Sequence, residues 1–417
     1  MAGRTTMSIV VAALVLVAAC DGDDAAIPVT TEAAVTTTTE VEARVSDGRL
    51  TLGVMLPTAE TSLREPLENA VNEAVERINN AGGVLERPVS VVFEDEGPTA
   101  ATAAAAVDAL LADDVDAIIG PPSSSAALNT LAAITTAEVL SCSPTASALA
   151  LDGFPDEELF FRTIPSDSLQ AEAIAQFAAQ TGAPTAAIVY VDDAFGRPFA
   201  EAVESALDGR PITVTELISF GANEEPTAAA QALARSDARV AIVLANGADG
   251  VRFLAAVDSI PDDVSLDAVI ANDALRDPNG TQRIGALGAT LRESIRGIAP
   301  QAVSDDPEEP FDPPGPYAAN AYDCVNLIAL SAERVQSDNP REIAGQMAAV
   351  SSSGSNCRSF AECAEALQQG FLIDYNGPSG LTELSVGRGD PSRARFDVFG
   401  FDDTGRDVVV QNIIATT

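Results

Sequence analysis

The chain has 417 residues, 47% of them hydrophobic, and its 62 acidic and 23 basic side chains give a formal net charge of −39. This size and apolar content predict a globular protein of two domains, and the negative charge argues against nucleic acid as a partner because it repels phosphate. Every basic residue is Arg, and the absence of His and Lys excludes Ser-His-Asp and Cys-His catalysis, His-ligated metals and Schiff-base chemistry. We therefore expect a protein that is not an enzyme and that uses no metal and no cofactor.

Residues 1–20 are predicted to form a lipoprotein signal peptide. Arg4 precedes an apolar run over 7–17, which is too short for a membrane span, and the segment ends in Val17-Ala18-Ala19-Cys20. These four residues resemble a bacterial lipobox, whose cysteine is acylated; the alternative is a plain signal peptide in which Cys20 is incidental. We expect a secreted protein that is lipid-anchored through Cys20, at the outer face of the bacterial cytoplasmic membrane or in the periplasm.

The segment 21–48 is predicted to be a disordered tether, because it is rich in Thr, Ala, Glu and Val and contains no aromatic residue. The folded body begins near Arg49. Four cysteines remain after Cys20, an even number that suits an oxidising compartment. A local disulfide is expected between Cys357 and Cys363, whereas Cys142 and Cys324 are either a second bridge or buried free thiols.

Strands and helices alternate along the body. Hydrophobic periodicity and turn residues predict strands at 50–56, 89–94, 115–119, 139–141, 186–191, 213–220, 240–244, 268–271, 394–401 and 408–413, and helices at 63–79, 99–112, 124–136, 197–207, 227–235, 250–258, 317–334 and 340–350. Apolar strands that alternate with amphipathic helices indicate parallel sheets covered on both faces. One sheet of all these strands would be unusually wide, so we predict an α/β protein of two doubly wound lobes, with ligands at the carboxyl ends of the strands.

Two turns at strand ends are candidates for binding a carboxylate. Gly120-Pro121-Pro122-Ser123-Ser124-Ser125 leads from a buried strand into a helix, where free N–H groups, the helix dipole and hydroxyls favour an anion. The alternative is that one serine is simply the helix cap. The second turn, Ser143-Pro144-Thr145-Ala146-Ser147, offers further hydroxyls and main-chain groups, and by itself it is more often a turn than a site.

Two later strand ends carry an aromatic ring and an acid. Phe195, in Asp192-Asp193-Ala194-Phe195-Gly196, is placed to cover an apolar ligand side chain, although a Phe is more often a core residue. Asp273 follows the strand at 268–271, where its carboxylate is placed to hold an ammonium group. With so many acids in the chain, a surface charge is the alternative for Asp273.

The chain resembles the type I periplasmic substrate-binding proteins, in particular the branched-chain amino acid group that binds leucine, isoleucine and valine. The likeness spans nearly all of residues 50 to 410 and rests on the order and spacing of AVERINNAGG (74–83), AIIGP (117–121), FRTIPSD (161–167), YVDDAFG (190–196), AYD (321–323) and YNGPSG (375–380). The resemblance implies two lobes joined by three crossings, near 163–165, 297–300 and 377–380. Lobe 1 would comprise 49–164 and 300–376, and lobe 2 would comprise 165–299 and 377–417.

The resemblance also implies roles for single residues. Ser124 would bind the ligand carboxylate, with main-chain and hydroxyl contacts from Ala146 and Ser147, while Phe195 would line the pocket. Ser123, in the same turn as Ser124, is a further candidate for binding the ligand. Asp273 matches the acid that holds the α-ammonium group.

The departures lie where the family places other pocket residues. A Ser-Gly turn is replaced by Pro57-Thr58-Ala59-Glu60, an aromatic position is occupied by Leu63 with Arg64 beside it, and an aromatic residue is missing near Asn246 and Gly247. A branched aliphatic ligand therefore does not follow from the resemblance alone.

The resemblance predicts a monomeric solute-binding component of an ABC-type uptake system, which traps an amino acid or related small carboxylate between its lobes and delivers it to permease subunits. Two alternatives remain: a ligand-sensing lipoprotein that acts on a membrane receptor, and a protein of the same fold that binds an amide or aromatic acid. Catalysis is not expected, because the adjacent acids Asp192 and Asp193 point apart on a strand end and no Gly-x-Ser-x-Gly elbow is present. Arg388-Gly389-Asp390 is interpreted as a turn.

Overall fold

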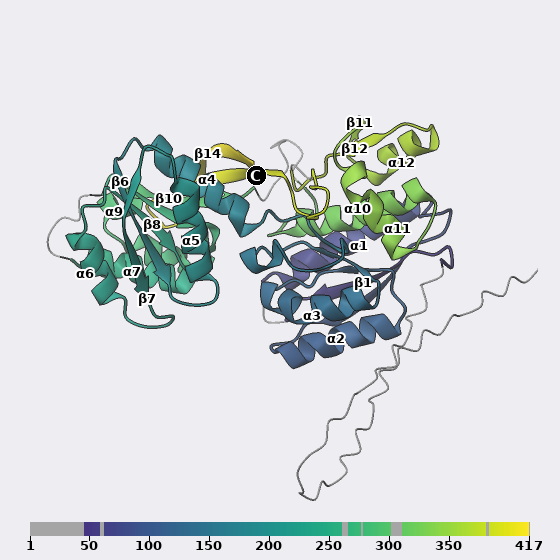
Figure 1. Cartoon of the computed structure of the whole chain (residues 1–417), viewed down its shortest axis with the longest axis horizontal. Coiled ribbons are helices and arrows are strands. Elements are labelled where there is room, and N and C mark those ends of the chain that lie inside the picture. The colour runs from purple at the N-terminus through teal and green to yellow at the C-terminus, as the bar shows by residue number, and fades with distance from the viewer. Residues whose placement is uncertain are drawn as a thin grey trace, which may run out of the picture. The chain divides into compact units, whose positions relative to one another are not determined.

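A computed structural model describes residues 46–58, 62–260, 266–276, 278–301, 311–380 and 383–416 (Figure 1). The predicted signal peptide, Cys20 and most of the predicted tether lie outside the described residues. The predicted α/β class is confirmed: the body contains two larger sheets flanked by helices, together with one two-stranded sheet.

The first sheet has five parallel strands in the order β2-β1-β3-β4-β5. Its strands are β1 (Thr51–Leu56), β2 (Ser90–Asp95), β3 (Ala117–Ile119), β4 (Leu140–Ser143) and β5 (Phe160–Arg162). β1 lies between β2 and β3, and the strand order reverses there. β3 and β4 are adjacent and parallel, so their carboxyl ends and the turns after them lie next to each other.

Helices cover both faces of the first sheet because its strands bury side chains on both sides. On β1, Leu52, Val54 and Leu56 join one core with three long helices, whereas Met55 joins the core on the opposite face. The first core is covered by α1 (Arg64–Asn80), α10 (Ala318–Val335) and α11 (Pro340–Val350), and the opposite one by α2 (Ala100–Ala112) and α3 (Ser124–Thr136) (Figure 1). This two-sided burial explains the continuous apolar runs that the sequence shows there.

The second sheet has seven strands in the order β14-β13-β10-β9-β8-β6-β7. Its strands are β6 (Thr185–Val191), β7 (Thr213–Phe220), β8 (Val240–Leu244), β9 (Ala268–Asn272), β10 (Ile295–Pro300), β13 (Arg393–Phe401) and β14 (Asp407–Thr416). The first five of these are parallel, as predicted, but β13 and β14 are added antiparallel. The short turn 402–406 joins β13 to β14, and so short a connection can join only antiparallel strands.

The second sheet is also covered on both faces. Along β6, Ala186, Ile188 and Tyr190 belong to one core, and the alternating residues Ala187 and Val189 belong to the other. The first of these cores contains α4 (Asp167–Gln180) and α5 (Gly196–Leu207), and the second contains α6 (Thr227–Arg235) and α7 (Gly247–Asp258). The shorter helices α8 (Thr281–Gly285) and α9 (Ala289–Ser294) precede β10.

The chain passes between the two sheets three times. The first passage joins β5 to α4 through 163–166, and the second joins β10 to α10. After the second passage come β11 (Ser355–Cys357), α12 (Phe360–Gln368) and β12 (Ile373–Tyr375). Leu384 still packs in the first core, eight residues beyond the predicted lobe boundary at 376, and the third passage therefore leads from Leu384 into β13.

Two disulfides tie the first core together. Cys142 on β4 is bonded to Cys324 on α10, across a sequence separation of 182 residues, and this resolves the alternative that the sequence left open. Cys357 is bonded to Cys363, the local pair that the sequence favoured, and this bond joins β11 to α12.

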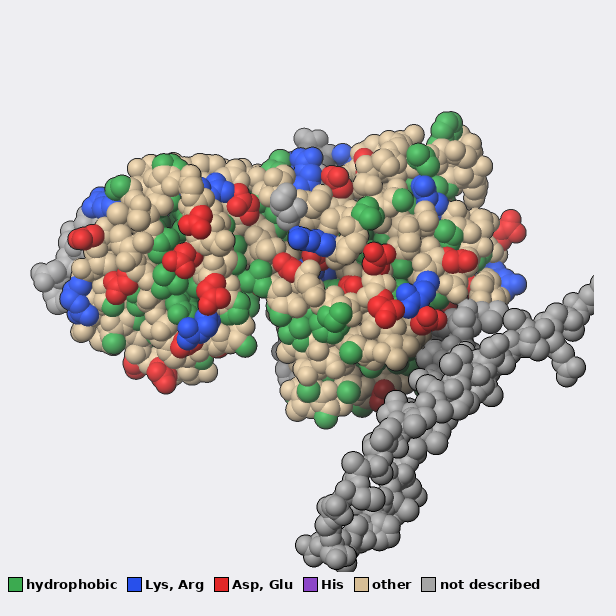
Figure 2. Space-filling model, in the orientation of Figure 1, with side chains coloured by type: hydrophobic (Ala, Val, Ile, Leu, Met, Phe, Trp, Pro, Cys, Tyr) green, Lys and Arg blue, Asp and Glu red, His purple; other side chains and the backbone are tan. Residues whose placement is uncertain are grey.

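The surface carries its acidic excess in dispersed form. On the face seen in Figure 2, Asp and Glu side chains are scattered, with Arg side chains among them. Several Arg side chains of the described residues form ion pairs, for example Arg77 with Glu73 and Arg341 with Glu138. No helix of the described segments is long and apolar enough to cross a membrane.

Candidate functional site

The turn after β3 uses Ser123 to build the start of α3. The Ser123 Oγ accepts a hydrogen bond from the Ala126 N–H at 3.1 Å and donates one to Glu96 Oε2 at 2.8 Å. Glu96 therefore already places an anion beside this helix start, and burial raises the pKa of its carboxyl even though hydrogen bonds from Ser123 oppose that rise. Ser123 thus has the capping role that the sequence left open as its alternative.

Hydroxyl groups join the turn after β3 to the turn after β4. Ser141 Oγ donates to the Gly120 carbonyl at 2.6 Å, and Ser143 Oγ donates to the Pro121 carbonyl at 2.7 Å. The Thr145 hydroxyl continues the series to the carbonyl of Pro122. These bonds satisfy three successive buried carbonyls, so the two turns form one connected surface.

Ser124 and the loop 145–148 lie together in this surface. Ser124 Oγ accepts a hydrogen bond from the Ala148 N–H at 3.2 Å, which leaves the Ser124 hydroxyl proton to donate elsewhere. Ala146 is fully buried, and its N–H donates to Ser143 Oγ at 3.0 Å. The structure therefore brings three of the predicted residues, Ser124, Ala146 and Ser147, into one neighbourhood.

Asp273 begins the short helical turn after β9. Gln170 on α4 donates through Nε2 to Asp273 Oδ1 at 3.0 Å and to the Ile298 carbonyl at 2.7 Å. Tyr317, just before α10, lies close enough to Asp273 to lower the pKa of its carboxyl. Burial raises the pKa of Asp273, and these contacts oppose that rise.

Asp167, the first residue of α4, lies near Asp273, and the two residues form an acid cluster. The sequence analysis predicted no role for Asp167. It is 3% exposed, and its main-chain N–H donates to the Ser147 carbonyl at 2.9 Å. Burial, followed by repulsion from Asp273, raises the pKa of Asp167 to about 7, although hydrogen bonding from Ser147 and the charge of Arg162 lower it. Among the described residues no Arg forms an ion pair with Asp167 or Asp273.

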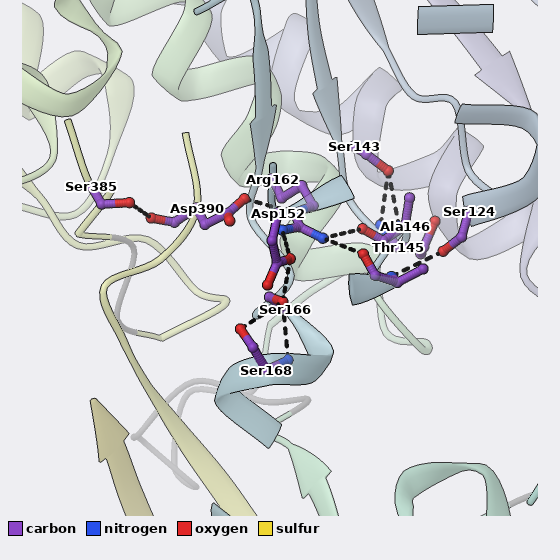
Figure 3. Close-up of polar contacts among 11 residues, drawn as sticks. Ser124, Ser143, Thr145, Ala146, Asp152, Arg162, Ser166, Ser168, Ser385 and Asp390 are labelled. Atoms are coloured by element: carbon purple, nitrogen blue, oxygen red, sulfur yellow. Dashed lines mark hydrogen bonds and ion pairs between the residues drawn. The ribbon is translucent and has the colours of Figure 1, made fainter. Parts of the chain in front are cut away.

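A buried arginine connects the loop 145–148 to the passages between the sheets (Figure 3). Arg162, at the end of β5, is fully buried and donates from Nε to Asp390 Oδ1 and from Nη2 to Asp152 Oδ1, each at 2.7 Å. Asp152 also accepts a hydrogen bond from Ser166 Oγ at 2.6 Å, and Ser166 is the cap of α4. Asp390 is therefore the partner of a buried cation, and the turn 388–390 is structural, as interpreted from the sequence.

Phe195 is not joined to the cluster described above. It lies just before α5, its ring is 37% exposed, and it packs edge-on against Phe199 with 5.5 Å between ring centroids. Among the described residues it makes no hydrogen bond or ring contact with Ser124, Ser147 or Asp273. Asp193 Oδ1 accepts hydrogen bonds from the N–H groups of Phe195 and Gly196, so this acid serves the start of α5.

The departures from the family pattern also have local structural roles. Leu63 is partly buried against the first core, and Arg64 donates from Nη1 to the Pro57 carbonyl at 3.0 Å. Asn246 caps α7 by accepting a hydrogen bond from the Asp249 N–H at 2.9 Å. None of these residues has an aromatic ring to place against a ligand.

The two α/β lobes, with connected turns at the ends of their parallel strands, have the architecture of a solute-binding protein. Residues 57–358 match the family described as Periplasmic binding protein, and the chain belongs to that family. The resemblance to its type I, branched-chain amino acid group is confirmed by the relatives. Proteins of this family are extracytoplasmic and bind solutes.

Curated relatives cover most of the chain. The chemotactic signal transduction system substrate-binding protein BasB of Halobacterium salinarum is 29% identical over 356 residues, which span 81% of this chain and 84% of that protein. The Leu/Ile/Val-binding protein homolog 3 of Brucella melitensis is 23% identical over 365 residues, which span 85% of this chain and 92% of that protein.

Solved structures share the fold. The branched-chain amino acid transporter substrate binding protein LivJ of Streptococcus pneumoniae, in complex with isoleucine, matches with a TM-score of 0.64 at 19% identity, over 88% of this chain and all of that one. The leucine binding protein LivK of Thermotoga maritima matches with a TM-score of 0.64 at 16% identity, over 87% of this chain and 98% of that one.

Proposed function

We propose that this protein is the extracytoplasmic solute-binding component of an ABC-type uptake system and that its solute is an amino acid. The observation that carries the proposal is the position of Asp167. Its main-chain N–H donates to the Ser147 carbonyl, in the donor-rich turn, and its carboxylate lies close enough to Asp273 for the two charges to repel each other. An amino acid carries one carboxylate and one ammonium group, and these complement a donor turn and an adjacent acid pair.

In the proposed complex the ligand carboxylate accepts hydrogen bonds from the Ser124 hydroxyl and from main-chain groups of the loop that contains Ala146 and Ser147. Asp273, supported by Asp167, holds the α-ammonium group. An ammonium beside two carboxylates relieves the repulsion that raises the pKa of Asp167. Phe195 is proposed to cover the ligand side chain only when the lobes close.

The proposed mechanism is a hinged trap. Ligand docks on the turns of the first lobe, and closure then adds contacts from the second lobe, so binding favours the closed state to the extent that ligand touches both lobes. We propose that the protein acts as a monomer without catalysis, that acylated Cys20 holds it at the membrane, and that permease subunits receive the ligand from the closed form.

Relatives named for leucine, isoleucine and valine support a branched-chain amino acid as the solute. The relative named for chemotactic signal transduction supports a second candidate, in which the same trap delivers its signal to a membrane receptor. Recovery of permease subunits with the protein from cross-linked native membranes favours uptake, and recovery of a receptor favours sensing.

A thermal-shift screen of the purified protein tests the ligand class. We expect L-leucine, L-isoleucine or L-valine to raise the melting temperature, because a ligand at a hundred times its Kd stabilises the folded state by about 2.7 kcal/mol. Short-chain amides and aromatic acids serve as the alternative arms of the screen. Stabilisation by those compounds and by no amino acid would contradict the proposal.

A further inference from the structure

Arg162 holds one side of the peptide group between Ala146 and Ser147. Its Nη1 is shared between the carbonyls of Ala146, at 3.4 Å, and Ala148, at 3.3 Å. This peptide bond is trans, and in a trans peptide the N–H points opposite to the carbonyl. The Ser147 N–H is therefore directed away from the buried guanidinium, and within the part of the chain that the structure describes it makes no hydrogen bond.

The guanidinium is itself fixed from two other segments of the chain. Asp390 and Asp152 accept from different nitrogens, so the planar group cannot rotate without losing a charged hydrogen bond. The Arg162 main-chain N–H also donates to the Gly389 carbonyl at 2.9 Å. Gly389 has a φ of 68°, and a Cβ there would lie 2.2 Å from the Phe160 carbonyl oxygen, so this turn requires glycine.

An arginine at this position is not explained by stability alone. Burying a cation with two acids roughly breaks even against a well-packed apolar group, because desolvation offsets the attraction. The guanidinium fork does what an apolar group or a lysine cannot: it directs several donors at fixed angles. Here those donors reach Asp390 in the third passage and the loop 145–148 (Figure 3). They also reach Asp152, which accepts a hydrogen bond from Ser166, the cap of α4.

We propose that Arg162 is a positioning residue for the ligand carboxylate: through the Ala146 carbonyl it directs the Ser147 N–H toward the ligand, and through Asp390 it ties that peptide to the third passage between the sheets. This inference rests on the proposed function, which it deepens. Arg162 itself does not touch the ligand.

The test compares wild type with Arg162→Lys, which keeps the charge and loses the fork. Isothermal titration with L-isoleucine is expected to show affinity at least tenfold weaker for Arg162→Lys. The amide resonance of Ser147, observed with ¹⁵N-serine labelling and assigned through Ser147→Thr, is expected to shift downfield when L-isoleucine is added to wild type. In Arg162→Lys this shift should be lost or strongly reduced, and a purely structural role would not alter it once the protein is folded.

Two control variants separate positioning from general damage. Arg239→Lys makes the same chemical change in an exposed ion pair with Asp267, and Val203→Ala lowers stability at a buried position of α5. Both controls should bind L-isoleucine with wild-type affinity. Asp390→Ala removes the acceptor of Nε and serves if Arg162→Lys does not fold. It should reduce both the Ser147 shift and the affinity for L-isoleucine, and no change in either would contradict the positioning role.

The outcomes distinguish the positioning role of Arg162 from the proposed function of the protein. If wild type binds L-isoleucine and Arg162→Lys binds it equally well with an unchanged Ser147 shift, the positioning role is wrong and the proposed function stands. If wild type binds no amino acid at all, the proposed function fails and the positioning role fails with it.

Discussion

Two buried ionic clusters lie on either side of the first passage between the sheets, and they differ in one respect. Before the passage, Arg162 supplies a cation to two carboxylates, Asp152 and Asp390. After it, Asp167 and Asp273 lie close enough to repel each other, and among the described residues no cation forms an ion pair with them. The first cluster is complete within the chain, whereas the second has two acids and no counter-ion of its own.

The pKa shifts reflect this difference. Burial raises the pKa of Asp390, but the adjacent Arg162 lowers it through a hydrogen bond and its charge. Burial and the like charge of Asp273 instead raise the pKa of Asp167 to about 7. A cluster that neutralises itself is suited to holding backbone in place, and a cluster that lacks a cation is suited to receiving one from a ligand.

The largest expected effect comes from removing the cation of the first cluster. Arg162→Met leaves the buried Asp390 and the half-buried Asp152 without a charged partner, and this should lower the free energy of unfolding by about 3–5 kcal/mol. Denaturant titration followed by circular dichroism measures the loss. The double variant Arg162→Met/Asp390→Asn should recover part of that stability, and no recovery would mean that the pairing with Asp390 does not matter.

The second cluster should respond in ligand affinity instead of stability. Asp273→Ala is expected to weaken L-isoleucine binding by about 1.5–3 kcal/mol, because it removes a charged partner of the ammonium group. Binding of 3-methylpentanoate, the analogue without the ammonium, should hardly change. Isothermal titration that shows an equal loss for both compounds would rule out the ammonium role of Asp273.

Much of the fold could be predicted from the sequence. The strands 213–220 and 240–244 and the helices 124–136 and 227–235 have the bounds that periodicity predicts. Helix α4 was missed, because it is buried on most of its surface and its apolar residues show no single face. The three-residue strand β5 and the antiparallel addition of β13 and β14 depend on tertiary contacts that local pattern does not encode.

The candidate site was less predictable than the fold. Strand ends drew attention to Ser124, Ala146 and Ser147, and the structure places these residues together because parallel sheets bring such turns side by side. Sequence could not tell that Ser123 would cap a helix, since several serines there compete for the same N–H groups. Asp167 and Arg162 stand in the FRTIPSD stretch that carried the family likeness, but their partners come from segments far apart in the chain.

The pH dependence of stability should separate the two clusters further. Because the pKa of Asp167 is about 7 in the folded protein and ordinarily 3.8, the folded state binds more protons between these values. The contribution of Asp167 to the free energy of unfolding is therefore complete below pH 3.8 and is lost as the pH rises to about 7. Asp167→Asn should gain on the order of 1–2 kcal/mol over wild type across this window, as measured by denaturant titration at a series of pH values.

Ligand supplies the control for that titration. Saturating L-isoleucine places an ammonium beside Asp167, so the advantage of Asp167→Asn should shrink at neutral pH. The buried Asp323, whose pKa burial raises to about 6, titrates in both proteins and cancels in their difference. An advantage of Asp167→Asn that does not change with pH would contradict the raised pKa of Asp167 in the folded protein.

The smallest effect is expected in the neutral, donor-rich turn. Ser124→Ala removes one hydroxyl donor to the ligand carboxylate and the acceptor of the Ala148 N–H, so affinity for L-isoleucine should fall by about 1 kcal/mol, or roughly fivefold. Ser125→Ala is the matched control, because its exposed hydroxyl lies near only that of Ser123 and its loss should leave affinity unchanged. The loss should also occur with 3-methylpentanoate, since that analogue keeps the carboxylate. The two ligands would then separate the two halves of the site. Asp273→Ala should weaken binding only of the ligand that has an ammonium group, whereas Ser124→Ala should weaken binding of both ligands, because both have a carboxylate.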